Sequence, residues 1–206
     1  MMMNEQRLSF VSPEAGVEAA RADMYGLLAN LFYAPPDAEL LARIVAVQAD
    51  PAGGVLDSAW LQLAAAAAQS DAVALAAEYE QLFIGTGKPE ILLYGSYYLS
   101  GFLMEKPLAA LRTDLHALGL ERDAQMPETE DHLAYLCEVM RYLITSEDAT
   151  HSALAMQRGF YATHLQLWTA RLCSAISEHP RAQFYAAVAA LAAAFFDVET
   201  LSFDME

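Results

Sequence analysis

The segment PETEDHLAYLCEVMRYLI, at positions 127 to 144, carries the side chains with the clearest potential for chemistry. It opens with three acids and a histidine and continues with tyrosines and acids. If one helix begins near Pro127, spacings of three and four residues place five polar side chains on one stripe: Glu128, Asp131, Tyr135, Glu138 and Tyr142. Carboxylates form charge-assisted hydrogen bonds with guanidinium groups, and aromatic rings form cation–π contacts with them. The stripe would therefore suit a partner that carries arginine.

A plainer interpretation of the same stripe is a solvated helix face. Acids in the first turn of a helix are stabilised by the positive end of its dipole, and proline suits the first helical position. This interpretation covers Glu128, Glu130 and Asp131 but not His132, which borders the apolar stripe. The residues alone favour the solvated face.

Patterns for catalysis and metal binding are incomplete elsewhere in the chain. The GTGK sequence at 85–88 resembles a phosphate-binding loop, but that motif needs glycine where Leu82 stands and Ser or Thr where Pro89 stands. The five histidines form no HxxxH pair and no Glu-x-x-His pair, and no G-x-S-x-G motif is present. We therefore expect no catalytic residues, no metal site and no cofactor, and we do not expect an enzyme.

Charge and composition narrow the classes of partner. The chain has 27 acidic and 11 basic residues, a formal net charge of −16, and this disfavours binding to nucleic acid or to anionic membranes. Its alanine-rich apolar runs predict packed helices rather than stable membrane insertion. The first residues lack the features of a secretory signal. Cys137 and Cys173 lie on apolar stripes, which predicts buried free thiols in a reducing compartment such as the cytoplasm.

The apolar periodicity predicts an all-α protein, a single helical-bundle domain of about eight or more helices. Expected helices cover 14–33, 37–46, 56–69, 71–83, 105–118, a segment from 127, 152–178 and a segment from 180. Asp37 is expected to cap the second helix, and Gly119 to end the fifth. Irregular residues 84–101 suggest a hinge-like loop within a domain at 14–200. We expect a flexible arm at 1–13 and an acidic tail at 201–206.

Several motifs resemble those of the TorD/DmsD/NarJ family of cytoplasmic chaperones for redox-enzyme maturation. The sequence ETEDHLAYLCEVM is similar to that family's E-P-x-D-H-x-x-x-x-L-E-F-M signature, with Glu128, Asp131, His132, Glu138 and Met140 matching. Further matches, in the expected order, lie in ADMYGLLANLFYAPPD, in EYEQLFIGTGKPEILLYGSYYLSG and in LRTDLHALGL. This chain departs from the family pattern at four positions. Thr129 and Leu93 stand where the family often has proline, Leu115 stands in place of a tyrosine, and Cys137 stands where leucine is common. The resemblance runs from about residue 20 to 200.

The resemblance implies a molecular chaperone. It would bind the N-terminal twin-arginine signal peptide, or a nearby segment, of the apo-form of a molybdenum-cofactor oxidoreductase. It would hold this client until the cofactor has been inserted and then release it for export. Combined with the acid–tyrosine stripe, this yields a predicted peptide-binding set: Tyr94, Ser96, Tyr97, Tyr98, Phe102, Glu128, Asp131, His132, Tyr135 and Glu138. Three acids of this set would receive the arginines, and the aromatic residues the apolar part. His132 would either bind peptide, with a pKa near neutrality that permits pH sensitivity, or pin the 84–101 loop.

Three alternatives stay open at this point. A NarJ-like assembly factor would act on a nitrate reductase-type complex without needing a signal peptide. Weak guanine-nucleotide binding and a generic helical interaction module are the others. The sequence names neither the client nor the oligomeric state, which can be a monomer or a domain-swapped dimer.

Overall fold

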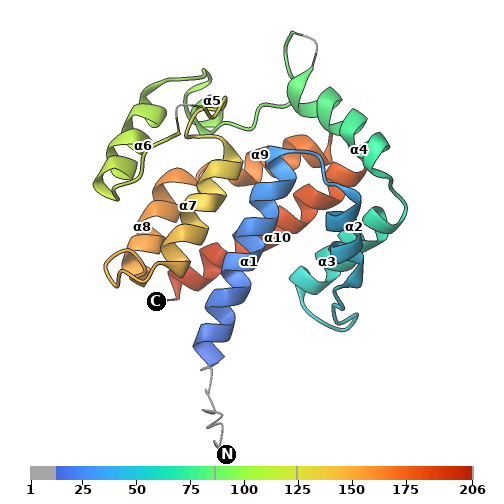
Figure 1. The fold of residues 1–206 in the computed structure, drawn as a ribbon, viewed down its shortest axis with the longest axis horizontal. Coiled ribbons are helices and arrows are strands. Elements are labelled where there is room, and N and C mark those ends of the chain that lie inside the picture. The colour runs from blue at the N-terminus through green and yellow to red at the C-terminus, as the bar shows by residue number, and fades with distance from the viewer. Residues whose placement is uncertain (1–12, 86, 124, 206) are drawn as a thin grey trace, which may run out of the picture.

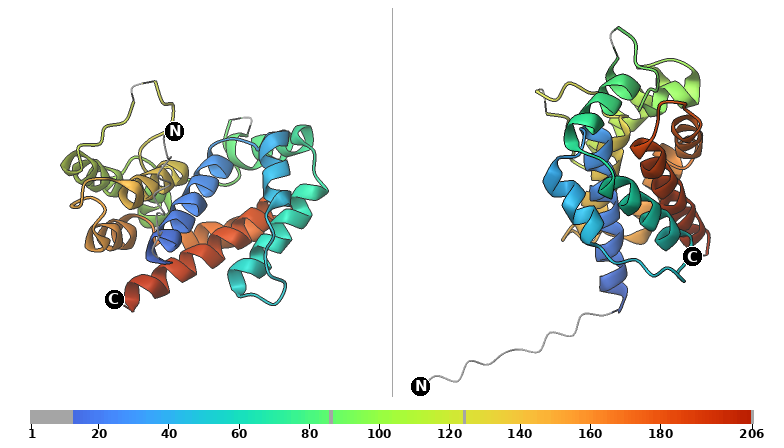
Figure 2. Two further views of the ribbon diagram at one scale, coloured as in Figure 1. Left: turned by 60° about the horizontal axis from the view of Figure 1, so that its bottom comes forward. Right: turned by 90° about the vertical axis from the view of Figure 1, so that its right-hand side faces the viewer.

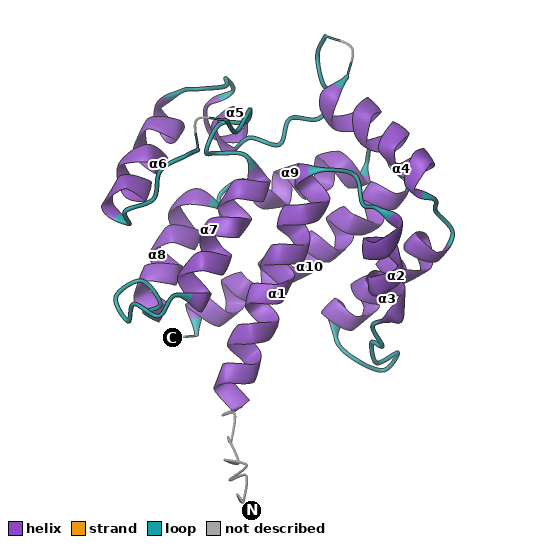
Figure 3. Ribbon diagram, viewed as in Figure 1, coloured by secondary structure: helices purple, strands orange, loops and turns teal. Residues whose placement is uncertain are grey.

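The computed structural model describes residues 13–85, 87–123 and 125–205. Within these ranges the chain forms ten α-helices and one π-helical segment, and it contains no strand. The predicted all-α class is thus confirmed (Figure 3). The predicted arm at 1–13 lies outside the described residues, apart from Pro13, where the first helix begins.

The helices follow one another along the chain, and the longest connection, at 118–132, joins α6 to α7. They are α1 (Pro13–Tyr33), α2 (Ala38–Ala46), α3 (Val55–Ala68), α4 (Ala72–Tyr79), the π-helical η1 (Glu80–Ile84), α5 (Gly95–Ser100), α6 (Lys106–Ala117), α7 (Leu133–Thr145), α8 (Leu154–His164), α9 (Thr169–Ser177) and α10 (Phe184–Asp204). Two predicted helix ends have the expected caps. The carboxylate of Asp37 accepts a hydrogen bond from the N–H of Leu40, and Gly119, just beyond α6, has a positive φ of 70°.

The centre of the molecule is built on α1, α7 and α10. In Figure 1, α1 and α7 lie beside each other with α10 behind them, while α2 and α3 stand on the far side of α1 from α7 and α8. The views in Figure 2 show α10 running beneath α1. Leu28 of α1 and Met140 of α7 are fully buried. Burying such a side chain contributes about 1.5–3 kcal/mol, so the α1–α7 contact is a main source of stability.

A buried ion pair joins the N-terminal and C-terminal helices. The guanidinium of Arg21 donates two hydrogen bonds to Glu199, at 2.7 and 2.8 Å, and Tyr25 donates a third at 2.9 Å. Glu199 is 1% exposed. The helix that holds it continues to Asp204, so most of the predicted acidic tail is part of α10 rather than an extension beyond the domain.

Length and composition alone would allow α10 to cross a membrane. It is the one such helix in the described chain, with a mean hydropathy of 1.6, and half of the apolar window is buried within the fold. The helix begins at Phe184, four residues after the predicted start at Pro180. The carboxylate of Glu78 sits at this start and accepts hydrogen bonds from the N–H groups of Gln183 and Tyr185, at 2.8 and 2.9 Å. A tertiary contact therefore defines where α10 begins.

The prediction of one long helix at 152–178 is wrong, because the chain breaks between α8 and α9. The indole N–H of Trp168 donates to the carbonyl of His164 at 2.6 Å, and the ring is fully buried. Gly95 packs directly on this ring: a Cβ added there would lie 3.1 Å from the indole nitrogen. The break thus positions Trp168 against the start of α5.

The two predicted free thiols are found in the core. Cys137 and Cys173 are both buried, and neither forms a disulfide within the described residues. Burial raises the pKa of the Cys173 thiol to about 12, which keeps it protonated and unreactive.

Candidate functional site

The segment before α7 is not helical: it turns at residues 129–132, where the N–H of His132 donates to the carbonyl of Thr129 at 3.0 Å, and His132 itself is extended. This segment pairs with the segment before α5: the N–H of Leu133 donates to the carbonyl of Leu93 at 2.8 Å, and Gly95 donates to Asp131 at 2.9 Å. Tyr94 and His132 form an isolated antiparallel bridge between them. The predicted helix start near Pro127 is therefore wrong by six residues. Glu128 and Asp131 do not share a helical stripe with Tyr135 and Glu138.

The carboxylate of Asp131 is held by hydrogen bonds within the protein. Its side chain accepts hydrogen bonds from the backbone N–H of Ser96 at 2.9 Å and from the hydroxyl of Thr129 at 2.6 Å. Asp131 is 3% exposed, and Ser96 is fully buried. These two residues were predicted to bind peptide, but a peptide could reach them only after the loop had opened.

His132 forms the N-cap of α7. Its Nδ1 accepts a hydrogen bond from the N–H of Ala134 at 3.2 Å, and its ring meets that of Tyr94 edge-on at 5.1 Å. Burial lowers the pKa of His132 to about 4, although the charges of Glu128 and Asp131 oppose this shift. The expected pKa near neutrality is thus corrected: His132 is neutral at physiological pH and is placed to hold the loop against α7.

Glu128 faces a small hollow of about 220 Å³ next to this bridge. The hydroxyl of Tyr94 donates to its carboxylate, and Tyr33 and His132 also line the hollow. Burial, followed by the hydrogen bond to Glu128, raises the pKa of Tyr94. Glu128 and Tyr94 therefore already satisfy each other in the free protein.

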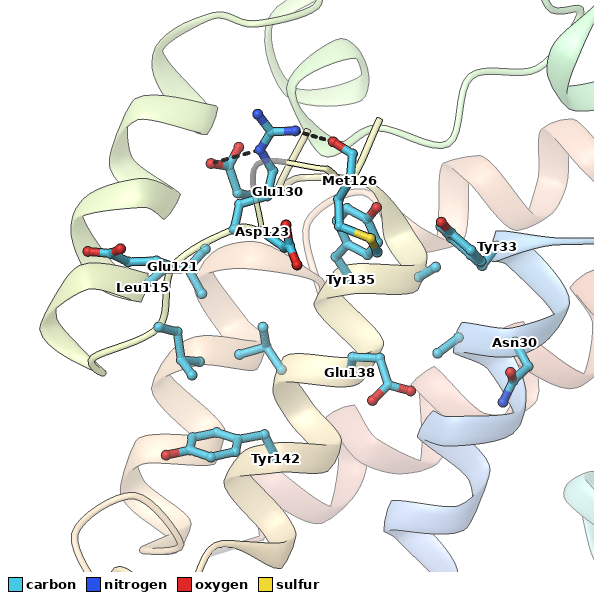
Figure 4. A pocket seen from close by; sticks show the side chains of 15 residues that line it. Asn30, Tyr33, Leu115, Glu121, Asp123, Met126, Glu130, Tyr135, Glu138 and Tyr142 are labelled. Atoms are coloured by element: carbon cyan, nitrogen blue, oxygen red, sulfur yellow. Dashed lines mark hydrogen bonds and ion pairs between the residues drawn. The ribbon is translucent and has the colours of Figure 1, made fainter. Parts of the chain in front are cut away.

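A groove of about 590 Å³ is lined by α1, by α7, by the end of α6 and by residues 120–123, 126 and 130 of the connection that follows (Figure 4). Its apolar lining residues are Ala29, Leu115, Leu120, Met126, Ala134 and Val139. Its acidic lining residues are Glu121, Asp123, Glu130 and Glu138, and its aromatic ones are Tyr33, Tyr135 and Tyr142. In Figure 4, Glu138 projects between α7 and α1, while Glu130 and Met126 lie at one end and Tyr142 lies near the other. The groove thus offers an apolar floor with carboxylates along it.

Two of these carboxylates differ in how firmly they are held. Glu130 receives a bidentate pair of hydrogen bonds from Arg112, at 3.0 and 2.9 Å. Burial would raise the pKa of Glu130, but the hydrogen bonds and the charges of Arg112 and Arg122 together lower it. Glu138 is 43% exposed and pairs with Arg141 on the same helix, at 2.7 Å. An exposed pair of this kind contributes about 0–1 kcal/mol, so Glu138 can exchange partners readily.

Tyr135 lines the same groove with an unsatisfied hydroxyl. Its oxygen is buried and has no hydrogen-bond partner among the described residues. Its ring lies 6.0 Å from that of Tyr33. Burial, followed by the neighbouring hydroxyl of Tyr33, raises the pKa of Tyr135 to about 12, so the group stays protonated and can donate a hydrogen bond.

The predicted aromatic residues of 94–102 lie outside this groove. Tyr98 is 8% exposed, and its ring stacks on that of Trp168 at a centroid distance of 5.6 Å. The guanidinium of Arg171 lies over the Tyr98 ring, 5.7 Å from its centroid. Tyr97 and Phe102 are exposed, at 39% and 69%. The ten predicted residues are therefore divided among the groove, the bridge with its hollow, and α5 with the turn that follows it.

Sequence reasoning missed several groove residues, and it left Tyr142 out of the predicted set. Tyr33 ends α1 and the acids of LERDAQM lie in the connection before Pro127, which periodicity treats only as a linker. The one available signal was the concentration of charge in that connection. No cluster of three or more metal-ligating side chains occurs in the part of the chain that the structure describes.

Comparison with known proteins places this arrangement in a family. Residues 53–174, more than half of the chain, match the family model described as nitrate reductase delta subunit. The chain belongs to that family. The family resemblance predicted from the D-H segment is thereby confirmed.

Several curated relatives of this chain carry the name chaperone protein TorD. The relative from Shewanella sp. (strain MR-4) is 30% identical over 206 residues, with 87% of this chain and 91% of the relative covered. The relative from Aliivibrio fischeri is 31% identical over 133 residues, with 61% and 62% covered. The relative from Vibrio cholerae (strain O395) is 32% identical over 128 residues, with 59% and 58% covered. The chain thus spans less than two thirds of the length of the last two.

A solved structure shares the fold. A crystal structure from Archaeoglobus fulgidus, assigned as a redox enzyme maturation protein, superposes with a TM-score of 0.57 at 20% identity. The match covers 94% of this chain and 99% of that one. At this level of identity the likeness establishes the all-helical architecture over nearly the whole chain.

Proposed function

We propose that this protein is a non-enzymatic chaperone that assists the maturation of a molybdenum-cofactor oxidoreductase in the cytoplasm. Membership of the family, together with relatives named TorD chaperones, supports this role. The more specific part of the proposal is that the protein binds the client's N-terminal twin-arginine signal peptide and holds it until the cofactor has been inserted.

The observation that carries the peptide-binding proposal is the groove between α1 and α7. Its apolar floor suits the hydrophobic part of a signal peptide, and its four carboxylates suit arginine. A groove of about 590 Å³ falls within the usual size range of ligand sites, roughly 300–1,000 Å³. The net charge of −16 would also draw a cationic peptide toward the protein.

The proposal is tested by calorimetric titration of the full chain with a twin-arginine signal peptide and with its Lys–Lys variant, at two salt concentrations. We expect saturable binding that weakens with salt and with the Lys–Lys change. Glu138→Gln should weaken binding about twofold to fivefold, as expected for loss of an exposed ion pair. Glu147→Gln, an equal charge change at an exposed position beyond α7, is the matched control. Absence of binding to several such peptides would overturn the signal-peptide proposal.

A second candidate is a NarJ-like assembly factor, favoured by the description of the family model as nitrate reductase delta subunit. Such a protein would bind a mature segment of its client whether or not a signal peptide precedes it. Binding to a client fragment from which the signal peptide has been removed, at unchanged affinity, would decide for this candidate.

A further inference from the structure

Arg122 occupies one end of the groove, where its guanidinium is bound by the protein's own acceptors. It donates hydrogen bonds to the backbone carbonyl of Met126 and, at 3.2 Å, to that of Glu128. Its Nε also lies 3.8 Å from the carboxylate of Glu130. Two carbonyls and one carboxylate thus converge on a single guanidinium. Arg122, Met126 and Glu130 all line the groove.

The two arginines that share Glu130 are bound with different strength. Arg112, from α6, makes the bidentate contact at 3.0 and 2.9 Å and thereby orients the carboxylate. The 3.8 Å separation between Arg122 and Glu130 exceeds hydrogen-bonding distance, so this pair relies on charge alone. Arg112 is the more exposed of the two, at 52% against 32% for Arg122, but it is Arg122 that lines the groove. Arg122 is the arginine that another guanidinium can replace.

We propose that these acceptors form an arginine subsite, which Arg122 occupies in the free protein and an arginine of the client peptide takes over on binding. This inference rests on the proposed peptide-binding function and names the residues that would recognise one arginine of the pair. Arg112 keeps Glu130 in place, and the carbonyls of Met126 and Glu128 supply directional acceptors that a lysine ammonium fits less well. The apolar floor begins beside the subsite at Leu120 and Met126.

Self-occupancy of this kind lowers the affinity for the client. The apparent affinity is reduced by the fraction of molecules in which the subsite is open. It also increases selectivity, because a peptide without an arginine at this position gains nothing by displacing Arg122. The hydroxyl of Tyr135, buried and unpaired among the described residues, lies in the same groove and would gain an acceptor from the bound peptide.

The test compares the wild type with Arg122→Gln and Arg43→Gln by calorimetric titration with a twin-arginine peptide and its Lys–Lys variant. Arg43→Gln removes the same charge from an exposed position in the last turn of α2 and controls for net charge. We expect Arg122→Gln to bind the twin-arginine peptide about threefold to tenfold more tightly than the wild type, the gain that follows if the subsite is largely self-occupied. Adding Glu130→Gln should abolish the gain. Urea unfolding verifies that each variant is folded.

The outcomes separate the subsite from the function. If the wild type binds the peptide but Arg122→Gln binds equally or more weakly, or if Arg43→Gln shows the same gain, the subsite is wrong and the chaperone proposal stands. If neither wild type nor variants bind, the signal-peptide proposal itself is overturned. A second measurement uses the wild type alone: the side-chain NMR signal of Arg122 should shift as the twin-arginine peptide is added. A signal that does not move at saturation contradicts displacement.

Discussion

The carboxylate of Asp131 accepts a hydrogen bond from the backbone N–H of Ser96 at 2.9 Å, and this bond joins segments that are 35 positions apart in the chain. Together with the Tyr94–His132 bridge, it holds the start of α5 against the start of α7. The D-H pair of the family signature therefore acts here as a clasp between two loops, while the groove lies farther along α7.

The first prediction concerns the clasp itself. Asp131→Asn should lower the free energy of unfolding by about 1.5–3 kcal/mol, because the buried carboxylate accepts two hydrogen bonds that an amide accepts less well. Urea denaturation at neutral pH measures this change. Asp23→Asn, the same substitution at an exposed position of α1, should change stability by no more than about 0.5 kcal/mol. Equal stability of the two variants would contradict the structural role of Asp131.

The second prediction is a pH dependence of stability. Because burial lowers the pKa of His132 to about 4, the unfolded state binds more protons than the folded state between about pH 4 and pH 6.5. Stability should thus fall as the pH falls through this window, by about 3 kcal/mol at most, and His132 should contribute no pH dependence above it. His164, whose pKa is also lowered by burial against the opposing effect of Asp114, adds to the same trend.

His132→Asn isolates this contribution, since asparagine can still cap α7. Urea unfolding of the wild type and the variant at a series of pH values should show a shallower decline for the variant. Curves that run parallel from about pH 6.5 to pH 4 would show that His132 titrates normally in the folded protein.

The third prediction concerns the ion pair between α1 and α10. Glu199→Ala should destabilise the protein by about 3–5 kcal/mol, because it leaves Nε and Nη2 of Arg21 and the hydroxyl of Tyr25 without the carboxylate that accepts from them. Glu18→Ala removes the other carboxylate on Arg21, which is 40% exposed, and should cost about 0–1 kcal/mol. Comparable losses in the two variants would show that burial does not govern this network.

The fourth prediction uses the unsatisfied hydroxyl in the groove. Tyr135→Phe should leave stability unchanged or raise it by up to about 1 kcal/mol, because a buried donor without a partner is removed. Tyr161→Phe is the matched change, since that hydroxyl donates to the carbonyl of Phe196 at 2.7 Å. It should cost about 1–2 kcal/mol. Thermal unfolding of both variants gives the comparison, and a loss in Tyr135→Phe equal to that in Tyr161→Phe would mean that Tyr135 is satisfied in the free protein.

Helices with a clear local signal were predictable to within about one residue. The first helix was expected at 14–33 and occurs at 13–33, and the second, with its Asp37 cap, ends at Ala46 as expected. Apolar residues at helical spacing and a local cap are properties of a short window, so the sequence contains them in full. Burial of the two cysteines followed from the same periodicity.

The elements that were misplaced depend on contacts between distant parts of the chain. Residues 127–132 have spacings that a helix would accept, but their backbone groups pair with the segment before α5, so α7 begins at Leu133. The apolar stripe of 152–178 continues through Trp168, yet packing of that ring on Gly95 accompanies a break in the helix.

The candidate site shows the same division. The sequence by itself determined the all-helical class, the acidic charge, and a signature that places the chain in its family. Tertiary structure decided that Asp131 and His132 are buried in a clasp while Glu130 and Glu138 line a groove. The physical reason is that hydrogen bonds and burial are set by which segments meet in space. Helical spacing fixes only which side chains share a face within one element.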